Sequence, residues 1–298
     1  MATPAEWLEG ARLRTLPAAL APVVAGSAIA LYFGGFDGPR ALLALVVALA
    51  LQVGVNYSND YSDGIRGTDS DENRVGPQRL VGSGAATPAQ VRGAAFACFG
   101  LACAAGLALV VLTGAWWLLA VGAACVLAAW YYTGGRRPYG YAGLGEAFVF
   151  VFFGLVATGG TTFVQLLAVP AASVWAGVAT GALACAILVA NNLRDVAGDA
   201  RVGKRTLAVR LGASGTRVAY VVCVVVGLAG FVLAAATSSW WGLLALAGLV
   251  PLAGTVRLVL GGASGPALIR VLKLTGLAEL AASVLLFAGL WLGPWLGR

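Results

Sequence analysis

The chain has 298 residues, of which 60% are hydrophobic and only 10% are charged, with a formal net charge of +7. A soluble domain carries roughly a quarter charged residues, so this composition excludes an ordinary water-soluble protein. The absence of histidine excludes mechanisms that need imidazole as a base or ligand. The five cysteines show no C-x-x-C spacing and therefore indicate neither a zinc site nor a disulfide framework.

Apolar segments long enough to cross a bilayer, about 20 residues each, recur from one end of the chain to the other. The first segment follows Arg12 and Arg14 and has a signal peptide as its alternative reading, but the many later segments favour a first membrane helix. We expect about nine spans, at residues 16–34, 41–58, 91–113, 115–132, 143–168, 172–194, 216–236, 239–260 and 274–295. The predicted fold class is therefore all-α, a polytopic membrane helical bundle formed by one domain over residues 1–298.

The distribution of lysine and arginine predicts how this bundle is oriented. With nine spans and a cytosolic N-terminus, 17 of the 19 cationic residues lie in cytosolic segments, and only Arg40 and Arg298 lie outside. Cationic loops are retained on the cytosolic side of a membrane. The net positive charge is thus explained by topology, and we expect the lipid bilayer and no nucleic acid as a partner.

Seven of the twelve acidic residues fall in two short stretches, and the first covers residues 56–72. A charge near the centre of a membrane helix costs roughly 2.5–3.5 kcal/mol, so such acids need partners or a purpose. Asn59 and Asp63 are one helical turn apart and share a face. Glycines at positions 64 and 67 are expected to end the helix and to let Asp69 fold back toward that face. Asp71 and Glu72 are equally well explained as solvated loop charges.

The second stretch begins with Asn191 and Asn192 and contains Asp195 and Asp199, which are again one helical turn apart. Carboxylate and amide oxygens, without sulfur or imidazole, are the ligands that Mg²⁺ prefers. Cationic residues follow at once, at Arg201, Lys204 and Arg205. Side chains that bind a cation, followed directly by side chains that donate to an anion, indicate that the bound molecule is an anion held through a metal ion. A diphosphate between two Mg²⁺ sites fits both stretches.

These two stretches resemble the UbiA superfamily of intramembrane aromatic prenyltransferases, which carries an N-D-x-x-D-x-x-x-D motif after the second helix and a D-x-x-x-D motif after the sixth. The first motif departs at its last acid, because position 67 is glycine and the next carboxylate is Asp69. That delay is typical of the type that prenylates 1,4-dihydroxy-2-naphthoate in menaquinone synthesis. Residues 10–17, 76–84, 132–146 and 203–212 are also similar to that type.

The resemblance implies a helical bundle around a central cavity in a bacterial plasma membrane, with the site facing the cytosol. The implied reaction is Mg²⁺-dependent transfer of a polyprenyl chain from polyprenyl diphosphate to 1,4-dihydroxy-2-naphthoate, with decarboxylation. The implied metal ligands are Asn59, Asp63, Asp69, Asp195 and Asp199, and the implied catalytic residues are Asp60, Asp63, Asp195 and Lys204. The implied substrate-binding residues are Arg79, Lys204, Arg205, Tyr132, Arg136, Arg137, Glu146 and Asn192.

Within these sets, Arg136 and Arg137 are expected to hold the carboxylate of the acceptor, and Asp60 to support the first metal site or to handle an acceptor proton. Aromatic walls for an allyl cation are sought among Tyr57, Tyr61, Tyr131, Tyr132, Phe148, Phe150, Phe152 and Phe153. Three alternatives stay open: a related enzyme with another acceptor such as 4-hydroxybenzoate, homogentisate or a chlorophyllide, an ion-coupled transporter, and a non-catalytic scaffold. A transporter gives no reason for Lys204 and Arg205 to follow Asp199.

Overall fold

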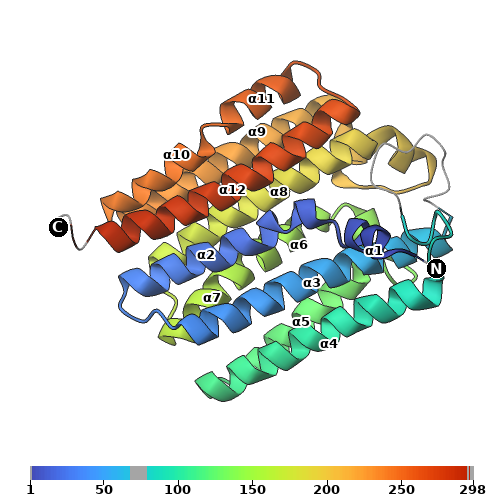
Figure 1. Cartoon of the computed structure of the whole chain (residues 1–298). Coiled ribbons are helices and arrows are strands. Elements are labelled where there is room, and N and C mark those ends of the chain that lie inside the picture. The colour runs from blue at the N-terminus through green and yellow to red at the C-terminus, as the bar shows by residue number, and fades with distance from the viewer. Residues whose placement is uncertain (1, 68–78, 294, 296–298) are drawn as a thin grey trace.

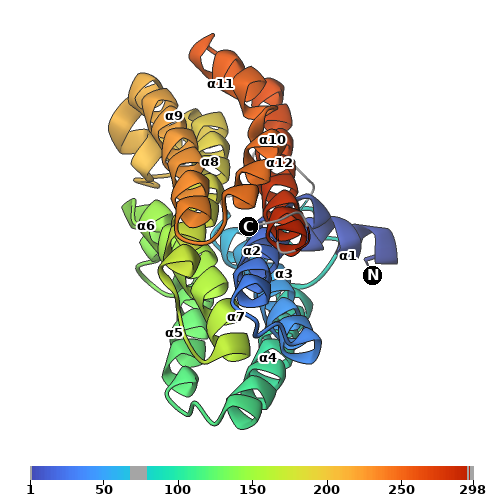
Figure 2. The same cartoon turned by 90° about the vertical axis from the view of Figure 1, so that its left-hand side faces the viewer.

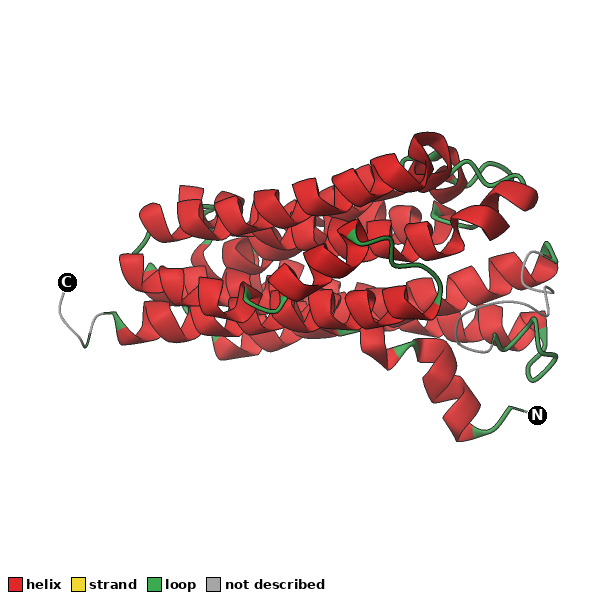
Figure 3. Cartoon of the chain, turned by 90° about the horizontal axis from the view of Figure 1, so that it is seen from above, coloured by secondary structure: helices red, strands yellow, loops and turns green. Residues whose placement is uncertain are grey.

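The computed structural model describes residues 2–67, 79–293 and 295. These residues form helices joined by loops and turns, and they contain no strand (Figure 3). The helices in chain order are α1 (Pro4–Ala11), η1 (Leu13–Thr15), α2 (Pro17–Tyr32), α3 (Gly38–Ile65), α4 (Pro88–Thr113), α5 (Leu118–Tyr131), η2 (Tyr139–Ala142), α6 (Gly145–Val149), the π-helical η3 (Phe150–Val156), α7 (Ala157–Leu166), α8 (Ala171–Arg201), α9 (Leu207–Ala236), η4 (Trp240–Leu244), α10 (Ala245–Leu249), α11 (Leu252–Leu260) and α12 (Pro266–Leu292).

The expected all-α membrane bundle is confirmed, and each of the nine predicted spans coincides with helix. Among the described residues, six helices are long and apolar enough to cross a membrane: α3, α4, the continuous unit α6–η3–α7, α8, α9 and α12. Two further spans are bent by 49° and 45°, where α1–η1 meets α2 and where η4–α10 meets α11. The remaining segment, α5, has only 14 residues. The described part of the chain therefore has six full spans, or eight if each bent pair is one span, and the expected nine is approximate.

Local sequence signals set the ends of several helices. Thr87 and Gln90 form a reciprocal capping box ahead of Pro88 at the start of α4, and Gly114 ends that helix in the left-handed region. The end of α3 differs from the prediction, because the helix continues through position 64 to Ile65.

Gly64 has a packing role where sequence predicted a helix break. A Cβ at this position would lie 2.4 Å from Cγ1 of Val81, so only glycine lets the chain after residue 79 lie against α3. The turn occurs three residues later, at Gly67, with φ of 69°.

Helix α8 lies in the middle of the bundle and packs against α9, α12, α2 and η3 (Figures 1 and 2). In its most apolar stretch 72% of the residues are buried, against 33–44% in the other five full-length spans. Many of the buried residues are alanines, which let membrane helices approach closely. The buried Tyr220 hydroxyl lies 2.8 Å from the hydroxyls of Thr255 and Thr275 and so connects α9, α11 and α12.

The two termini lie at opposite ends of the bundle (Figure 1). The end at which α3 begins is held together by an arginine. Arg40, at the start of α3, donates to the carbonyls of Leu112 at 3.0 Å and Val164 at 3.1 Å, which belong to the last turns of α4 and α7. It also pairs with Asp37 at 3.2 Å. Exposed tryptophans of the kind that settle at a membrane surface begin or precede helices α5 and η4, at Trp116, Trp117, Trp240 and Trp241.

The contact between η3 and α8 gives a first testable prediction. A Cβ on Gly154 would lie 2.5 Å from the Gly177 carbonyl oxygen and 2.6 Å from Gly181 Cα, and backbone cannot give way there. Gly154→Val should therefore destabilise the protein by about 1–3 kcal/mol or prevent its accumulation. Thermal unfolding in detergent measures this, with Gly93→Ala as the control because a Cβ at position 93 meets nothing within 4 Å. Equal melting temperatures for the two variants would contradict the close approach.

Candidate active site

One large cavity, of about 1120 Å³, opens among α2, α3, α4, α5, η3, α8 and α12. Its polar end contains side chains from α3, from α8 and from the segments that follow them, namely Asn59, Asp63, Arg79, Asn191, Asn192, Asp195, Asp199 and Lys204. Its remaining wall is mostly apolar and includes Val47, Leu109, Leu118, Phe152 and Phe153. The two acidic stretches, about 135 residues apart in sequence, thus face the same space.

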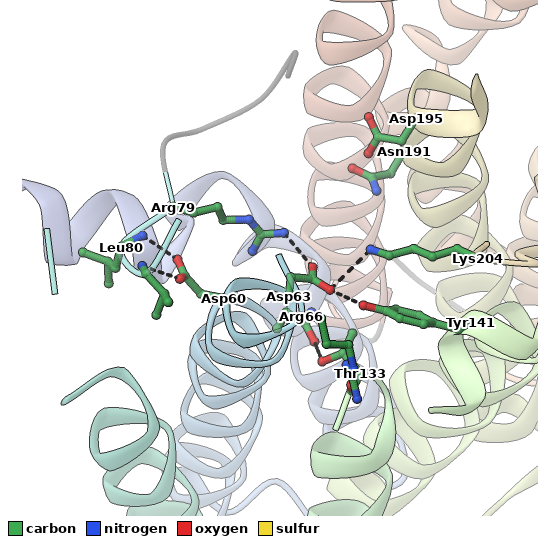
Figure 4. Close-up of polar contacts among 12 residues, drawn as sticks. Asp60, Asp63, Arg66, Arg79, Leu80, Thr133, Tyr141, Asn191, Asp195 and Lys204 are labelled. Atoms are coloured by element: carbon green, nitrogen blue, oxygen red, sulfur yellow. Dashed lines mark hydrogen bonds and ion pairs between the residues drawn. The ribbon is translucent and has the colours of Figure 1, made fainter. Parts of the chain in front are cut away.

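Asp63 is the centre of the polar contacts on the α3 side (Figure 4). Arg79 Nη2 lies 3.3 Å from Asp63 Oδ2, and Lys204 Nζ lies 3.3 Å from Asp63 Oδ1. The Tyr141 hydroxyl also donates to Oδ1. Only 6% of the Asp63 side chain is exposed, so these charge-assisted bonds act where water screens them little.

Tyr141, in the turn η2, lies between two cations, Lys204 and Arg66. Lys204 Nζ lies 4.5 Å from the centroid of its ring, and the guanidinium carbon of Arg66 lies 5.4 Å from it. Burial raises the pKa of the Tyr141 phenol, and the adjacent Asp63 carboxylate adds to that effect. Tyr141 therefore stays protonated across the physiological range and remains a donor to Asp63.

Asn59 is positioned from the α5 side of the cavity. Its Oδ1 accepts a hydrogen bond of 2.7 Å from the Thr133 hydroxyl. Arg66, at the end of α3, donates to the carbonyls of Thr133 and Gly135. The end of α3 and the turn after α5 are thus held together by side chain to backbone contacts, which fixes the amide of Asn59 at the cavity wall.

On the α8 side, Arg194 forms a fork with Asp195, with Nε 2.7 Å from Oδ1 and Nη2 2.6 Å from Oδ2. The same Nη2 lies 2.9 Å from Oδ1 of Asn191. One turn further on, Asp199 lines the cavity, and its carbonyl accepts from the Lys204 backbone amide at 2.9 Å. That bond turns the chain so that the Lys204 side chain reaches across to Asp63.

Asp60 has a different position from the one predicted. Its two carboxylate oxygens accept hydrogen bonds from the backbone amides of Leu80, at 2.8 Å, and Val81, at 2.9 Å, and the residue does not line the cavity. These contacts give Asp60 a structural role, and the expected metal-supporting or proton-handling role stays a prediction. Asp60 anchors the segment that carries Arg79.

Replacement of Asp60 by alanine should therefore act on stability first. Two buried amides would lose their acceptor, at a cost of about 1–3 kcal/mol each. We expect a melting temperature several degrees lower than that of the parent protein, measured in detergent. Asp60→Asn keeps one acceptor oxygen, so its melting temperature should lie between those of the parent protein and Asp60→Ala. A wild-type melting temperature for both variants would show that Asp60 does not anchor the segment after residue 79.

The remaining predicted residues divide into two groups. Tyr132 and Asn192 line the cavity, and Glu146 supports it from behind by accepting a bond of 2.9 Å from Asn192 Nδ2. Three predicted cations do not reach it, because the side chains of Arg136, Arg137 and Arg205 are exposed and outside the cavity wall. Asp69, Asp71 and Glu72 lie outside the described residues.

The aromatic lining was only partly predicted. Among the rings proposed from sequence, those of Tyr132, Phe148, Phe152 and Phe153 line the cavity, whereas Tyr57, Tyr61, Tyr131 and Phe150 do not. Two further rings, Tyr139 and Tyr141, were missed. Cations were missed as well, since Arg14, Arg194 and Lys273 all line the cavity.

The chemistry of the donor set fits a divalent cation. Asn59 and Asp63 on α3 and Asn191, Asp195 and Asp199 on α8 offer hard oxygens to one space, with no sulfur or imidazole among them. No group of three or more acidic or cysteine side chains close enough to hold a metal occurs within the described ranges. Mg²⁺ is satisfied by one or two carboxylates together with phosphate oxygens and water, so this sparse arrangement suits it.

A cavity of a helical membrane protein that combines acid groups, cations and an apolar extension suits a lipid-linked anion held with a divalent cation. Residues 19–274 match the UbiA prenyltransferase family, and the chain therefore belongs to that family. The expected prenyltransferase is confirmed.

Individual relatives agree with this assignment. The chain is 54% identical to the 1,4-dihydroxy-2-naphthoate octaprenyltransferase of Mycobacterium tuberculosis, with 94% of each chain covered. It is 38% identical to the Escherichia coli protein of the same name, with 97% of this chain and 96% of the other covered. The fold is similar to that of an Archaeoglobus fulgidus UbiA homologue solved with DMAPP and Mg²⁺, with a TM-score of 0.67 at 14% identity, covering 97% of this chain and 100% of the other.

Proposed function

We propose that this chain, acting as one domain, transfers a polyprenyl chain from polyprenyl diphosphate to 1,4-dihydroxy-2-naphthoate, with loss of CO₂, in a Mg²⁺-dependent step of menaquinone synthesis. The observation that carries the proposal is that Asp63 on α3 and Asp195 and Asp199 on α8 line one cavity, whose remaining wall is mostly apolar. The names of the relatives support the choice of acceptor.

Transfer breaks the bond between the allylic carbon and the diphosphate oxygen, so the site must stabilise the departing anion. Asn59, Asp63, Asp195 and Asp199, with Asp69 from outside the described residues, would hold Mg²⁺. Bound Mg²⁺ neutralises developing charge on the leaving oxygens, an effect of several kcal/mol. Arg79 and Lys204 lie close enough to Asp63 to donate to the same diphosphate.

The prenyl chain would extend from the diphosphate into the apolar part of the cavity, between Val47, Leu109 and Phe153. Burial there keeps water from the allylic carbon as positive charge develops on it. Phe148 and Phe152, whose ring centroids are 6.0 Å apart, stand on the same wall. Cation–π contact with such rings is favourable by about 0.5–2 kcal/mol.

The new carbon–carbon bond forms at the ring carbon that bears the carboxylate, and the bond to that carboxylate then breaks and releases CO₂. The ring regains its aromaticity without loss of a ring proton, so no general base is needed at this carbon. The acceptor carboxylate needs a cation instead, and we assign this role to Arg14 and Lys273, two of the cations that line the cavity, since Arg136 and Arg137 lie outside it. Arg14→Gln and Lys273→Gln should each raise KM for the acceptor about tenfold, with KM for the donor unchanged. Unchanged acceptor KM in steady-state assays of both variants would remove this assignment.

The orientation expected from the distribution of lysine and arginine is compatible with this function. The N-terminus and the polar end of the cavity face the cytosol of a bacterial cell, where a charged acceptor is dissolved, and the donor enters from the bilayer. Cysteine introduced at Arg136, an exposed position beside the site, should react with an impermeant maleimide only in opened or inverted membranes. Labelling in intact cells would reverse the orientation.

Competition among acceptors tests the function itself. Purified protein receives a polyprenyl diphosphate, Mg²⁺ and equal concentrations of 1,4-dihydroxy-2-naphthoate, 4-hydroxybenzoate and homogentisate, and products are identified by mass spectrometry. Prenylated naphthoquinol should dominate. Predominance of another prenylated ring would reassign the acceptor, and the absence of any prenylated product would refute the proposal.

A further inference from the structure

Arg194 makes a contact that the proposed reaction does not by itself explain. Its guanidinium binds both oxygens of Asp195, at 2.7 and 2.6 Å, and the amide oxygen of Asn191, at 2.9 Å. Asp195 is a ligand that the proposed function assigns to the cation site, and Asn191 offers a further hard oxygen to the same space. The Arg194 side chain is only 7% exposed and the Asp195 side chain is 31% exposed, so water reaches the contact mainly from the Asp195 side.

A guanidinium and a divalent cation cannot share these oxygens without strong repulsion. Asp195 has two oxygens, both are in the fork, and the fork also reaches the amide one turn earlier. A metal ion that binds here must therefore displace Arg194 from at least one oxygen. The displaced guanidinium stays in the cavity that it already lines, beside Arg14. There it needs a new anion, because a buried cation without a partner is costly.

Asp63 shows the same arrangement on the opposite wall, where Arg79 and Lys204 contact its two oxygens. Each half of the site thus has its own internal cations on the oxygens that a metal would use. Diphosphate is the one ligand of the proposed reaction that supplies enough negative charge to receive those cations when metal takes the carboxylates.

Resting on the proposed function, we infer that Arg194 is a positioning residue that competes with the divalent cation for Asp195 and Asn191, so that metal binds tightly only together with the diphosphate. Two partners are exchanged. Asp195 would bind the metal ion in place of Arg194, and Arg194 would bind phosphate oxygens in place of Asp195. By linkage, the diphosphate strengthens metal binding by the same factor as the metal strengthens diphosphate binding.

Equilibrium dialysis of the purified full-length protein against Mn²⁺, with and without geranyl diphosphate and without acceptor, tests this inference. Arg194→Gln should bind Mn²⁺ about tenfold more tightly than wild type when the diphosphate is absent, and its affinity should rise less when the diphosphate is added. Arg194→Lys keeps the charge but loses the fork, and should fall between the two proteins.

Two matched variants separate this contact from a general change of charge. Arg14→Gln removes the same charge from the same cavity, and Arg270→Gln removes it from an exposed position outside the cavity wall. Arg270→Gln should change Mn²⁺ affinity by less than about twofold because its exposed charge is screened. Arg14→Gln should give a clearly smaller gain than Arg194→Gln, because it leaves the contact between Arg194 and Asp195 in place. Unchanged or weaker Mn²⁺ binding by both Arg194 variants, or an equal gain in Arg14→Gln, would overturn the inference. Failure of the wild type to bind Mn²⁺ even with geranyl diphosphate would overturn the proposed function as well.

Discussion

Asp63→Asn should lower kcat for prenyl transfer by about 100- to 1,000-fold, since stabilisation of a leaving anion by preorganised charge contributes an effect of this size. The amide has the same shape as the carboxylate, but it loses the negative charge that attracts the metal. It also leaves Arg79 and Lys204, both within 3.3 Å, without their carboxylate. Initial rates at saturating donor and acceptor measure the change.

Two controls accompany that variant. Its melting temperature shows whether the fold survives. Asp60→Asn provides the same chemical change three residues earlier, on a side chain that accepts from the backbone amides of Leu80 and Val81 and does not line the cavity. Asp60→Asn should keep most of the kcat of folded protein. A fall of equal size in both variants would mean that loss of structure, and not loss of a ligand, explains the effect at Asp63.

Lys204→Gln should reduce kcat by about 100-fold, because an ammonium group aimed at the leaving diphosphate is worth as much as one oxyanion donor. The Lys204 side chain is 14% exposed, lies against Tyr141 and points into the cavity. Single-turnover measurements with a bound donor separate this loss in the chemical step from a change in donor affinity.

The neighbouring residue gives this prediction its sharpest control. Arg205 carries the same charge one position later, but its side chain is exposed and outside the cavity. Arg205→Gln should therefore keep nearly the wild-type kcat. If the two variants were equally impaired, the local charge of the loop would be what matters, and the position of Lys204 would not.

Positions on regular helices were predictable from the sequence, because helical periodicity decides which side chains share a face. Asn59 and Asp63 on α3 and Asp195 and Asp199 on α8 all face the cavity, as their spacing predicts. Periodicity did not reveal the neighbours of Asp60, whose partners come from a chain segment 20 residues later. Helical periodicity predicts the face of the helix on which a side chain lies, but it does not predict which residue that side chain contacts.

Positions in turns were not predictable in this way. Arg205 follows Lys204 directly, yet only Lys204 reaches the cavity, because the Asp199 carbonyl and the Tyr141 carbonyl fix the backbone amides of the two residues in different directions. Arg136 and Arg137 were assigned to the acceptor from their place in a cytosolic loop, and that loop directs them to the surface. The contacts that orient a turn are made by distant parts of the chain.

The cations inside the site were also not predicted from the sequence, because their positions depend on contacts between distant parts of the chain. Arg194 stands next to Asp195 in sequence, but neighbours on a helix point in different directions unless a long side chain folds back, as this one does. Lys273 and Arg14 reach the cavity only because α12 and the bend before α2 close it. The number of spans also depended on bends and on the short α5, which hydropathy does not reveal.

Removal and return of the divalent cation tests the central claim most directly. Product formation from a polyprenyl diphosphate and 1,4-dihydroxy-2-naphthoate is followed on purified protein with Mg²⁺, after chelation with EDTA, and after Mg²⁺ is restored in excess. The expected result is loss of prenyl transfer to background on chelation and full recovery on restoration. Undiminished transfer after chelation would contradict a metal-dependent site between Asp63 and Asp195.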